Sequence, residues 1–399
     1  MSETTTITAL GRRGDGIAER DGQRVFVPLA LPGEVVQIER DGDRGTLVGV
    51  ETPSADRVEA FCPHFGVCGG CQLQHLDRPF YESFKTGLVV AALEKAGLDV
   101  KSDRFVDASG RGRRRATLHA RKEGAGYMRL RSHQVADIAH CPILVPELAS
   151  RAPAIARAVE AVIGEADVAF TASDSGIDVA VRTQRRQARA ERLMPLLGEF
   201  GLARLAMNGE TLLQAQPPTL AIGRASVNLP VNAFLQATAA AEQTLGEYAL
   251  AGIGKAKRVA DLFCGVGTFA FRLAEQAQVT AFDSDRGAIT ALQQAARHAS
   301  GLKTVTGFRR DLFRDPLTRF EFDGFDAVVL DPPRAGAMAQ VEELCASKIG
   351  QVVMIACDAG TFARDAERLV QAGFTLRDLQ IVDQFAWSTH VEIAATFTR

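Results

Sequence analysis

Long apolar runs are missing from this sequence. No window approaches the roughly 20 apolar residues that a membrane helix needs, and the opening MSETTTITALGRRGDG contains no apolar core of signal-peptide length. We therefore expect no membrane association and a cytoplasmic location. The hydrophobic fraction of 46% and the charged fraction of 24% are those of an ordinary globular protein, and 399 residues suffice for two or three domains.

Cysteine and tryptophan are both scarce. Seven cysteines, an odd number in a chain without an export signal, argue against a disulfide framework and for a reducing compartment. The single tryptophan, Trp387, could either stack on a nucleobase or pack in the core.

An excess of charge of one sign is also missing, because 46 Lys and Arg stand against 48 Asp and Glu for a net charge of −2. The cations are unevenly placed, however, with clusters at 110–115 (GRGRRR), 129–131 (RLR) and 182–192 (RTQRRQARAER). Each cluster fits either a solvated face or a phosphate-binding surface. Composition alone leaves this choice open.

Three regions of the chain differ in pattern, and we expect one domain from each. Residues 1–54 combine short alternating segments with Asp-Gly pairs, which favour tight hairpins, and they predict a small β-barrel. Residues 55–230, entered through a linker at 51–57, predict an α+β domain with a basic face. Residues 231–399 alternate strand and helix, which predicts a parallel, doubly wound α/β sheet. The Asp-Gly pairs lie at 15–16, 21–22 and 41–42.

The apolar spacing predicts individual elements in the second and third regions. In the second region it predicts helices at 79–97 and 146–164 and strands at 113–121 and 176–184. In the third region the predicted strands are 258–263, 278–283, 326–331 and 351–356, and the predicted helices are 268–276, 286–300, 341–348 and 361–373. A last segment, 390–398, could add an antiparallel strand.

A glycine-containing loop follows the first predicted strand of the third region. In VADLFCGVGTFAF (259–271) the chain turns on Gly265 and Gly267, but the third glycine of the dinucleotide fingerprint and a phosphate-binding lysine are both absent. Asp283, at the next strand end, stands where an acid would bind ribose hydroxyls. S-adenosylmethionine suits this set, because it carries a ribose, no phosphate and a sulfonium cation. Plain α/β architecture is the alternative.

The following strand end carries Asp331, in VVLDPPRAG (328–336). The two prolines have a restricted φ and bias Asp331 to an extended conformation, so its carboxylate is held where open α/β sheets bind ligands. Together with Asp261 and Asp283, it could accept hydrogen bonds from the cofactor and offset its positive charge. The alternative is that the prolines only end the strand.

Cys357 ends one further strand, in VVMIACDAGTFARD (352–365). We predict that Thr361 caps the helix that follows, and that the positive end of this helix favours the thiolate of Cys357. Alternatively, Cys357 packs as a small buried apolar residue, which is how we interpret Cys264 and Cys345.

Four other cysteines have the spacing of a metal site. Cys62, Cys68 and Cys71 lie close together in FCPHFGVCGGCQL, and Cys141 supplies a distant fourth thiol. This set could complete tetrahedral ligation. The spacing does not separate zinc from iron–sulfur, although a tight trio with one remote ligand favours a cubane cluster. We interpret the neighbouring histidines as ordinary polar residues: His64, His75 and His140.

Together these motifs resemble the RNA 5-methyluridine methyltransferase family, whose members methylate C5 of uridine in ribosomal or transfer RNA. The resemblance rests on FLQ (234–236), DLFCGVGTF (261–269), DPPRAG (331–336), IACDAGTFARD (355–365) and DQFAWSTHVE (383–392). In addition, residues 14–34 resemble the small RNA-binding β-barrel called TRAM. The resemblance covers nearly the whole chain.

The resemblance implies a class I, Rossmann-like methyltransferase domain that uses S-adenosylmethionine. It also implies a mechanism in which a thiolate adds to C6 of uracil, C5 takes the methyl group, and a base removes the C5 proton. The nucleophile would be Cys357 and the base Glu392. The family's cofactor positions match Gln236, Phe263, Thr268, Asp283, Asp311 and Asp331.

The resemblance further implies a metal and an RNA partner. Family members with this cysteine spacing carry a [4Fe–4S] cluster, which would here be held by Cys62, Cys68, Cys71 and Cys141 in a structural role. The cluster and the barrel favour 23S ribosomal RNA, bound by a monomer. The target uridine must be unpaired or flipped out for a thiolate to reach C6. Candidates for phosphate contacts are Arg113, Arg114, Arg115, Arg129 and Arg131.

Departures from the family pattern leave reactivity and substrate fit open. Asp358 and Ala359 stand where Asn-Pro is common, so that Asp358 could raise the pKa of Cys357 or contact the base, and Ala386 stands where proline is usual. Three alternatives remain: a transfer-RNA uridine-C5 methyltransferase, an amino-group methyltransferase that would need no cysteine, and a noncatalytic RNA-binding assembly factor.

Overall fold

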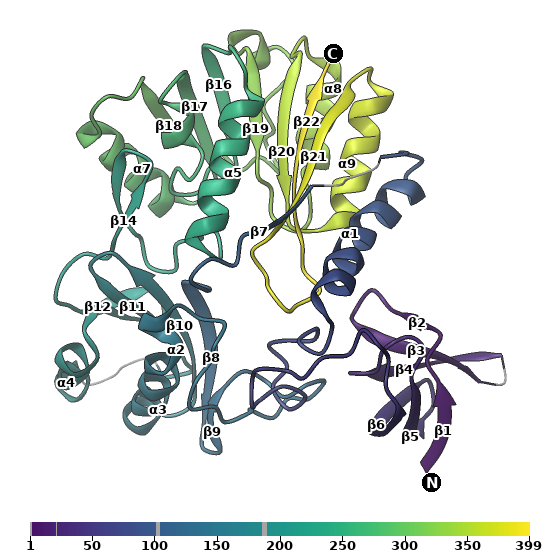
Figure 1. Cartoon of the computed structure of the whole chain (residues 1–399). Helices are drawn as coiled ribbons and strands as arrows, with labels where there is room; N and C mark the ends of the chain where they lie inside the picture. Colours follow the sequence, from purple (N-terminus) through teal and green to yellow (C-terminus); the bar gives the residue numbers. More distant parts are fainter. Residues whose placement is uncertain (1, 21, 101–103, 186–189) are drawn as a thin grey trace.

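The structure is a computed structural model, and it describes residues 2–20, 22–100, 104–185 and 190–399. Figure 1 shows a small N-terminal sheet, a second sheet with helices on one side, and a larger sheet with helices on both sides. Two sequence predictions fall partly outside the described residues: Asp21 of one Asp-Gly pair, and 186–189 of the cationic run at 182–192.

The N-terminal sheet has the strand order β1-β5-β6-β4-β3-β2. A hairpin joins β5 and β6 at the third Asp-Gly pair as predicted, although Asp41 is the last residue of β5 and the turn residues are Gly42 and Asp43. The turn predicted at Asp15-Gly16 is wrong, because both residues lie within β3, where a Cβ on Gly16 would meet the Ala30 carbonyl oxygen at 2.8 Å. The strands are β1 (Ser2–Thr6), β2 (Ala9–Leu10), β3 (Asp15–Arg20), β4 (Gln23–Pro28), β5 (Val35–Asp41) and β6 (Arg44–Thr52).

The second sheet has the order β13-β12-β11-β10-β8-β9, with helices α2 to α4 packed against it. The helix predicted at 146–164 is two helices that break at Ser150. The strands are β8 (Arg115–Arg121), β9 (Gly124–Gly126), β10 (Ala166–Ser173), β11 (Gly176–Arg182), β12 (Leu202–Met207) and β13 (Glu210–Gln214). The helices are α2 (Pro146–Ala149), α3 (Arg151–Ile163) and α4 (Ala190–Phe200). A separate hairpin follows, β14 (Thr219–Ile222) and β15 (Ala225–Asn228).

The large sheet has the order β18-β17-β16-β19-β20-β22-β21-β7. Its first five strands are parallel, and β22 runs antiparallel to both β20 and β21, as the pattern at 390–398 predicted. The strands are β16 (Arg258–Leu262), β17 (Gln278–Asp283), β18 (Val305–Arg309), β19 (Ala327–Leu330), β20 (Gln351–Ala356), β21 (Thr375–Asp383) and β22 (Glu392–Thr398).

Two apolar cores cover the two faces of this sheet, which confirms the doubly wound α/β fold. One core contains Leu245 of α5 and Leu292 of α7, and the other contains Val341 of α8 and Leu369 of α9. The helices are α5 (Ala239–Gly252), α6 (Ala270–Leu273), α7 (Arg286–His298), α8 (Met338–Ala346) and α9 (Ala359–Gln371), with a 3-10 turn at Glu321–Gly324.

Two elements from the first third of the chain join the large sheet. Helix α1 (Arg78–Lys95) begins after the N-cap Asp77 and places Val89 and Leu93 in the core that α9 also enters. Strand β7 (Phe105–Asp107) pairs in parallel with β21 and forms the edge of the sheet. Figure 1 shows α1 between the N-terminal sheet and the large sheet, beside the yellow loop that joins β21 to β22.

Candidate active site at the strand ends

The strand order reverses between β16 and β19. From β16 the chain proceeds to β17 on one side, whereas β19 and β20 lie on the other side. Ligands of open α/β sheets bind at such a point, outside the carboxyl ends of the strands. Asp283, Asp331 and Cys357 lie at or directly after these ends, and Glu392 joins them because it is the first residue of the antiparallel β22. The structure therefore brings these four predicted residues to one edge.

The two glycines of the loop after β16 serve different purposes. Gly265 has φ +54°, a Cβ added there would meet no atom within 4 Å, and its N–H donates to Asp283 Oδ2 at 2.9 Å. Gly267 has φ +100°, and a Cβ there would lie 2.6 Å from the Phe271 ring. The first glycine thus leaves room for a ligand beside Asp283, while the second permits close packing. Thr268, which follows, is buried.

Phe263 and Asp311 both lie close to Phe313. Phe263 has φ +62°, which is uncommon for a bulky residue and marks a locally strained loop. Its ring centroid lies 5.5 Å from that of Phe313. Asp311, after β18, accepts the Phe313 N–H at 3.1 Å. The strand ends therefore carry an aromatic pair on the side of β17 and β18.

On the side of β19 and β20, two buried side-chain amides link the carboxylates of Asp331 and Glu392. Gln236 Nε2 donates to Asp331 Oδ2 at 3.0 Å. Gln384 Nε2 donates to Gln236 Oε1 at 2.7 Å and to Glu392 Oε2 at 2.6 Å. Gln236, Gln384 and Glu392 are each at most 2% exposed. These hydrogen bonds fix the relative positions of Asp331 and Glu392.

Burial and mutual repulsion raise the pKa values of the carboxyl groups here. Burial raises the pKa of Asp331 to about 7 against the opposing hydrogen bond from Gln236. The pKa of Glu392 is raised well above its usual range, first by burial and then by Asp331, while Gln384 and Arg334 oppose the shift. Asp261 is fully buried within β16, its oxygens have no hydrogen-bond partner among the described residues, and burial raises its pKa too.

Cys357 lies half-buried between β20 and α9. Burial, followed by the charges of Glu392 and Asp331, raises the pKa of its thiol to about 11, while Arg334 opposes the shift. The positive end of α9 therefore does not bring the pKa of this thiol below its usual range in the protein alone. The N-cap predicted at Thr361 is also wrong, because Asp358 caps α9 and accepts the Thr361 N–H at 2.9 Å. Asp serves as well as Asn at this position.

Two residues that contact or influence this site were not singled out from the sequence. Gln384 lies in the motif DQFAWSTHVE and Arg334 in DPPRAG. Gln384 hydrogen-bonds Glu392, and Arg334 lowers the pKa of both Glu392 and Cys357. Both lie within motifs that carry the family resemblance, and this position in the motifs is the sequence signal that could have identified them.

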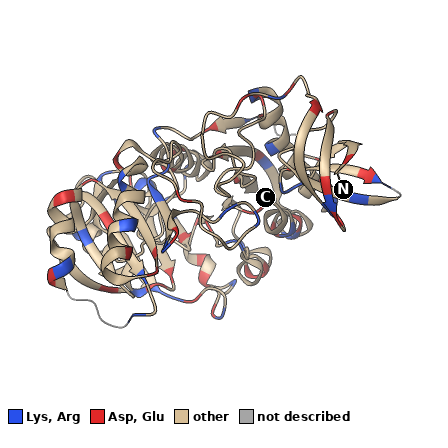
Figure 2. Cartoon of the chain, turned by 90° about the horizontal axis from the view of Figure 1, so that it is seen from below, with Lys and Arg blue, Asp and Glu red and all other residues tan. Residues whose placement is uncertain are grey.

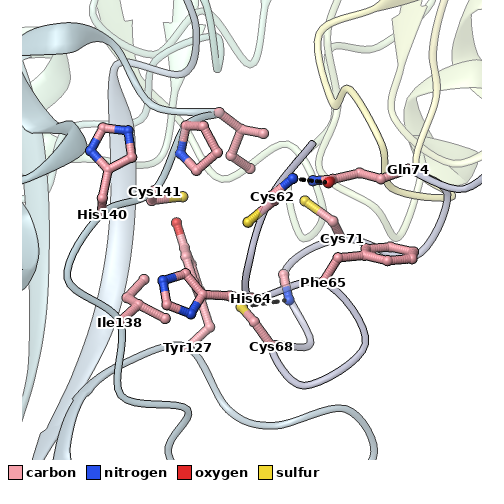
Figure 3. A pocket seen from close by; sticks show the side chains of 13 residues that line it. Cys62, His64, Phe65, Cys68, Cys71, Gln74, Tyr127, Ile138, His140 and Cys141 are labelled. Carbon is pink, nitrogen blue, oxygen red and sulfur yellow. Dashed lines mark hydrogen bonds between the residues drawn. The ribbon is translucent and has the colours of Figure 1, made fainter. Parts of the chain in front are cut away.

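The four remaining candidate cysteines line a single pocket (Figure 3), with Cys62, Cys68 and Cys71 on one loop and Cys141 on the facing segment. Burial raises the pKa of Cys71 to about 12 and of Cys141 to about 11, and the charge of Cys68 adds to both shifts. Nevertheless, within the described ranges no group of three or more His, Cys, Asp or Glu side chains is arranged to hold a metal ion. His64 and His140 also line the pocket, whereas His75 is buried elsewhere.

The arginines predicted to contact phosphates differ in exposure. Arg114 is 5% exposed, pairs with Glu242 at 2.5 Å and donates to the Gln236 carbonyl oxygen at 3.0 Å, so the prediction is wrong for this residue. Arg129 is exposed, and Arg131 is exposed but pairs with Asp15. Figure 2 shows cations and anions interspersed over the chain.

Trp387 packs between other rings. Its ring centroid lies 4.9 Å from that of Tyr81 and 5.6 Å from that of Phe61. This contact fits the packing alternative. Among the helices that the structure describes, none is both long and apolar enough to cross a membrane.

Comparison with known proteins gives a consistent picture. The family described as tRNA (Uracil-5-)-methyltransferase matches residues 222–399. A protein of Caulobacter vibrioides named an uncharacterized RNA methyltransferase is 43% identical, with 99% of each chain covered. A protein of Brucella suis with the same description is 42% identical over 99% of this chain and 97% of its own length.

Two further similarities concern better-defined proteins. The 23S rRNA (uracil(1939)-C(5))-methyltransferase RlmD of Xanthomonas axonopodis is 31% identical over 99% of this chain and 97% of its own length. The crystal structure of the Pyrococcus abyssi tRNA (uracil-54, C5)-methyltransferase with S-adenosyl-L-homocysteine superimposes with a TM-score of 0.76 at 21% identity, covering 99% of this chain and 100% of the other. The second similarity establishes a shared fold.

Proposed function

Because the chain belongs to the RNA uracil-5-methyltransferase family, we propose that it methylates C5 of a uridine in 23S ribosomal RNA, using S-adenosylmethionine. The choice of 23S RNA is supported by the 31% identity to the protein named RlmD over nearly the full length of both chains. A transfer-RNA substrate is the second candidate, suggested by the description of the matching family. The family assignment leaves the amino-group and noncatalytic alternatives without support.

Cys357 and Glu392 carry this proposal, because the pairing of β20 with β22 sets them side by side. Ala356 and Ile393 are paired residues of the two strands, and Cys357 and Glu392 are their neighbours at the same end. The charge of Glu392 raises the pKa of Cys357, which reports their proximity. A nucleophile beside a base is the arrangement that covalent catalysis requires.

Cys357 acts as the nucleophile in this proposal. Its thiol releases its proton to solvent, and the thiolate sulfur forms a bond with C6 of uracil while the C5–C6 π electrons move to C5 and the O4 carbonyl. Arg334 is the nearby cation that favours the thiolate. S-adenosylmethionine, when bound, supplies an electrophilic methyl group and a positive charge that would offset Asp331 and Glu392.

Glu392 acts as the base. After C5 has received the methyl group, the Glu392 carboxylate takes the C5 proton, the C5–C6 double bond re-forms, and the sulfur of Cys357 leaves as a thiolate. A raised pKa makes Glu392 a strong proton acceptor once it is ionised. Its burial also keeps water away from the transferred proton.

The cofactor residues of this proposal surround the strand ends. Asp283, beside the open face of Gly265, would hold the ribose hydroxyls. Gln236 and Asp331 would lie near the sulfonium, and Phe263 and Asp311 near the adenine. The complete set is Gln236, Phe263, Thr268, Asp283, Asp311 and Asp331.

We also propose that Cys62, Cys68, Cys71 and Cys141 hold a [4Fe–4S] cluster. Three close thiols and one remote thiol are the spacing that favours a cubane cluster over a single zinc ion. Gln74 lines the pocket, and its Oε1 accepts the Cys62 N–H at 3.2 Å. Its Nε2, which has no hydrogen-bond partner among the described residues, is left as a donor for sulfur. The cluster would tie the loop at 62–71 to the segment at 141.

RNA binding is proposed for the remaining surface, by a monomer in the cytoplasm. The N-terminal sheet of residues 1–54 would act as a TRAM-like RNA-binding barrel, and 55–230 as a cluster-bearing domain beside the methyltransferase domain of 231–399. A groove lined by Arg12, Arg44 and Arg131 runs from the barrel to His390 of the β21–β22 loop. These cations would contact phosphates, which predicts binding that weakens with salt.

An RNA containing 5-fluorouridine tests the proposed function. Fluorine at C5 cannot leave as a proton does, so the wild-type protein with S-adenosylmethionine should form a stable protein–RNA adduct on a denaturing gel. Cys357→Ala should form none. Catalytic turnover on normal RNA without any adduct on fluorinated RNA would refute the proposed mechanism. Mapping 5-methyluridine in cells that lack the protein decides between 23S and transfer RNA.

A further inference from the structure

Gln384 is a buried side-chain amide that makes three hydrogen bonds. Its Oε1 accepts the Ala237 backbone N–H at 2.6 Å, and its Nε2 donates to Gln236 and to Glu392. The orientation of this amide is determined, because a backbone N–H can only donate and therefore requires the oxygen to face it. The NH₂ group must then face Gln236 and Glu392.

The orientation of Gln384 determines that of Gln236. Since Gln384 donates to Gln236 Oε1, the NH₂ group of Gln236 faces Asp331 and donates to its carboxylate. Each carboxylate thus receives one N–H from a directed chain that starts at a backbone amide. Such chains polarise each other and strengthen their hydrogen bonds.

The loop that follows Gln384 is anchored from α1. Lys85 and Asp383 form a buried ion pair at 2.5 Å, and Lys85 Nζ also donates to the Phe385 carbonyl oxygen at 3.1 Å. Tyr81 donates to Asp383 and accepts the Trp387 N–H at 3.0 Å. Asp383 and Phe385 flank Gln384, so its backbone is held on both sides.

The same loop contacts the cysteine-bearing segment. The Trp387 carbonyl oxygen accepts the N–H groups of Gln72 at 2.8 Å and Leu73 at 3.0 Å, directly after Cys71. Figure 1 shows this yellow loop extending from the large sheet toward the loops below it. Gln384 therefore sits where the methyltransferase sheet, α1 and the cysteine loop meet.

We infer that Gln384 is a positioning residue for the removal of the C5 proton, holding Glu392 and Gln236 in their working orientations. This inference rests on the proposed function. It assigns Gln384 to the last step of the reaction, because the side chain contacts the base directly and contacts Cys357 through none of its hydrogen bonds. Loss of its donors should slow proton removal far more than methyl transfer, because Gln236 keeps its hydrogen bond to Asp331.

Single-turnover reactions separate these steps. The probes are unmodified 23S rRNA and tRNA transcripts that contain [5-³H]uridine. The variants are tested on the transcript that the wild type methylates. In Gln384→Met, tritium release should slow by about 10- to 100-fold, and a methylated protein–RNA adduct should accumulate. Ser388→Ala is the matched control, since Ser388 bonds the Phe385 carbonyl oxygen in the same loop without contacting Glu392. It should change both steps by less than about threefold.

The pH profile gives a second readout that a merely structural role would not move. Glu392 faces Asp331, Arg334 and Cys357, and the Gln384 donor favours its ionised form. In Gln384→Met the acid limb of tritium release should therefore move to higher pH. Gln384→Glu keeps an oxygen that can accept the Ala237 N–H. Its tritium release should be slow at neutral pH. The deficit relative to the wild type should shrink as the pH falls and the introduced carboxyl is protonated.

Three outcomes would overturn the inference. These are wild-type tritium release in Gln384→Met, equal losses of adduct formation and release, and an unshifted acid limb. A wild-type protein that releases no tritium from either RNA would instead refute the proposed function, and the inference with it.

Discussion

The strand-end site and the cysteine pocket hold their reactive groups in different ways. At the strand ends, the pairing of β20 with β22 sets Cys357 beside Glu392, and buried amides fix the carboxylates. In the pocket, three thiols come from a loop and Cys141 from a separate segment. A site on a sheet keeps its shape without a ligand, whereas a site on loops depends on the ligand for its final geometry.

Replacing Cys357, the proposed nucleophile, should give the largest effect and show whether the covalent chemistry takes place at the strand ends. We expect Cys357→Ala to lower methyl transfer to RNA by about 10⁴-fold or more, because removal of a nucleophile leaves only binding effects. Transfer of tritiated methyl groups to RNA measures it. Cys345→Ala, on α8, is the control and should stay within about twofold of wild type. Substantial activity in Cys357→Ala would move the chemistry elsewhere.

The buried ion pair beneath the strand-end site tests how rigidly that site is held. Lys85 is 0% and Asp383 1% exposed in their side chains. Lys85→Met should lower the free energy of unfolding by about 3–5 kcal/mol, because it leaves a buried charge unpaired. Urea unfolding measures this effect. The exposed pair Arg104–Asp378 is the control, and Arg104→Met should cost less than about 1 kcal/mol. Equal costs would contradict the rigid framework.

Removal of one thiol from the cysteine pocket tests whether that site depends on its ligand for stability. Cys141→Ser should lower the iron content of anaerobically purified protein and the free energy of unfolding by on the order of 2–3 kcal/mol. Iron analysis and urea unfolding measure the two effects. The difference from wild type should shrink after both proteins are treated with a chelator. A wild-type protein without iron whose stability ignores chelators would refute the proposed cluster.

The smallest effect concerns the thiol of Cys357 itself. Because its pKa is raised to about 11, alkylation by iodoacetamide should rise about tenfold per pH unit through pH 8–10. Peptide-resolved mass spectrometry isolates this cysteine from the others. Glu392→Gln removes a facing charge and should lower the pKa, so alkylation at pH 8 should increase a few-fold. A plateau below pH 9 in the wild type would contradict the raised pKa.

Local patterns predicted the sheet and its edge well. The apolar runs located β16, β17, β19 and β20, and parallel strands share one carboxyl edge, so Asp283, Asp331 and Cys357 could be placed together in advance. The helix predicted at 268–276 is only Ala270–Leu273, because the chain remains in turns after the glycine loop.

Long-range contacts could not be predicted in this way. No local signal indicates that β7 pairs with β21, since a three-residue strand has no period of its own. The same holds for Gln384, whose three partners lie at Ala237, Gln236 and Glu392. Asp15-Gly16 has the composition of a turn, but the packing of Gly16 against Ala30 outweighs that preference.

The placement of α1 and β7 on the large sheet determines what happens when the C-terminal part of the chain is produced alone. A fragment beginning at residue 231 would lack both elements, leaving the backbone edge of β21 open and the apolar side of α9 bare. Such a fragment would self-associate through that edge. Supplying residues 77–108 as a separate peptide should restore a soluble species. The chain is therefore suited to split-protein complementation.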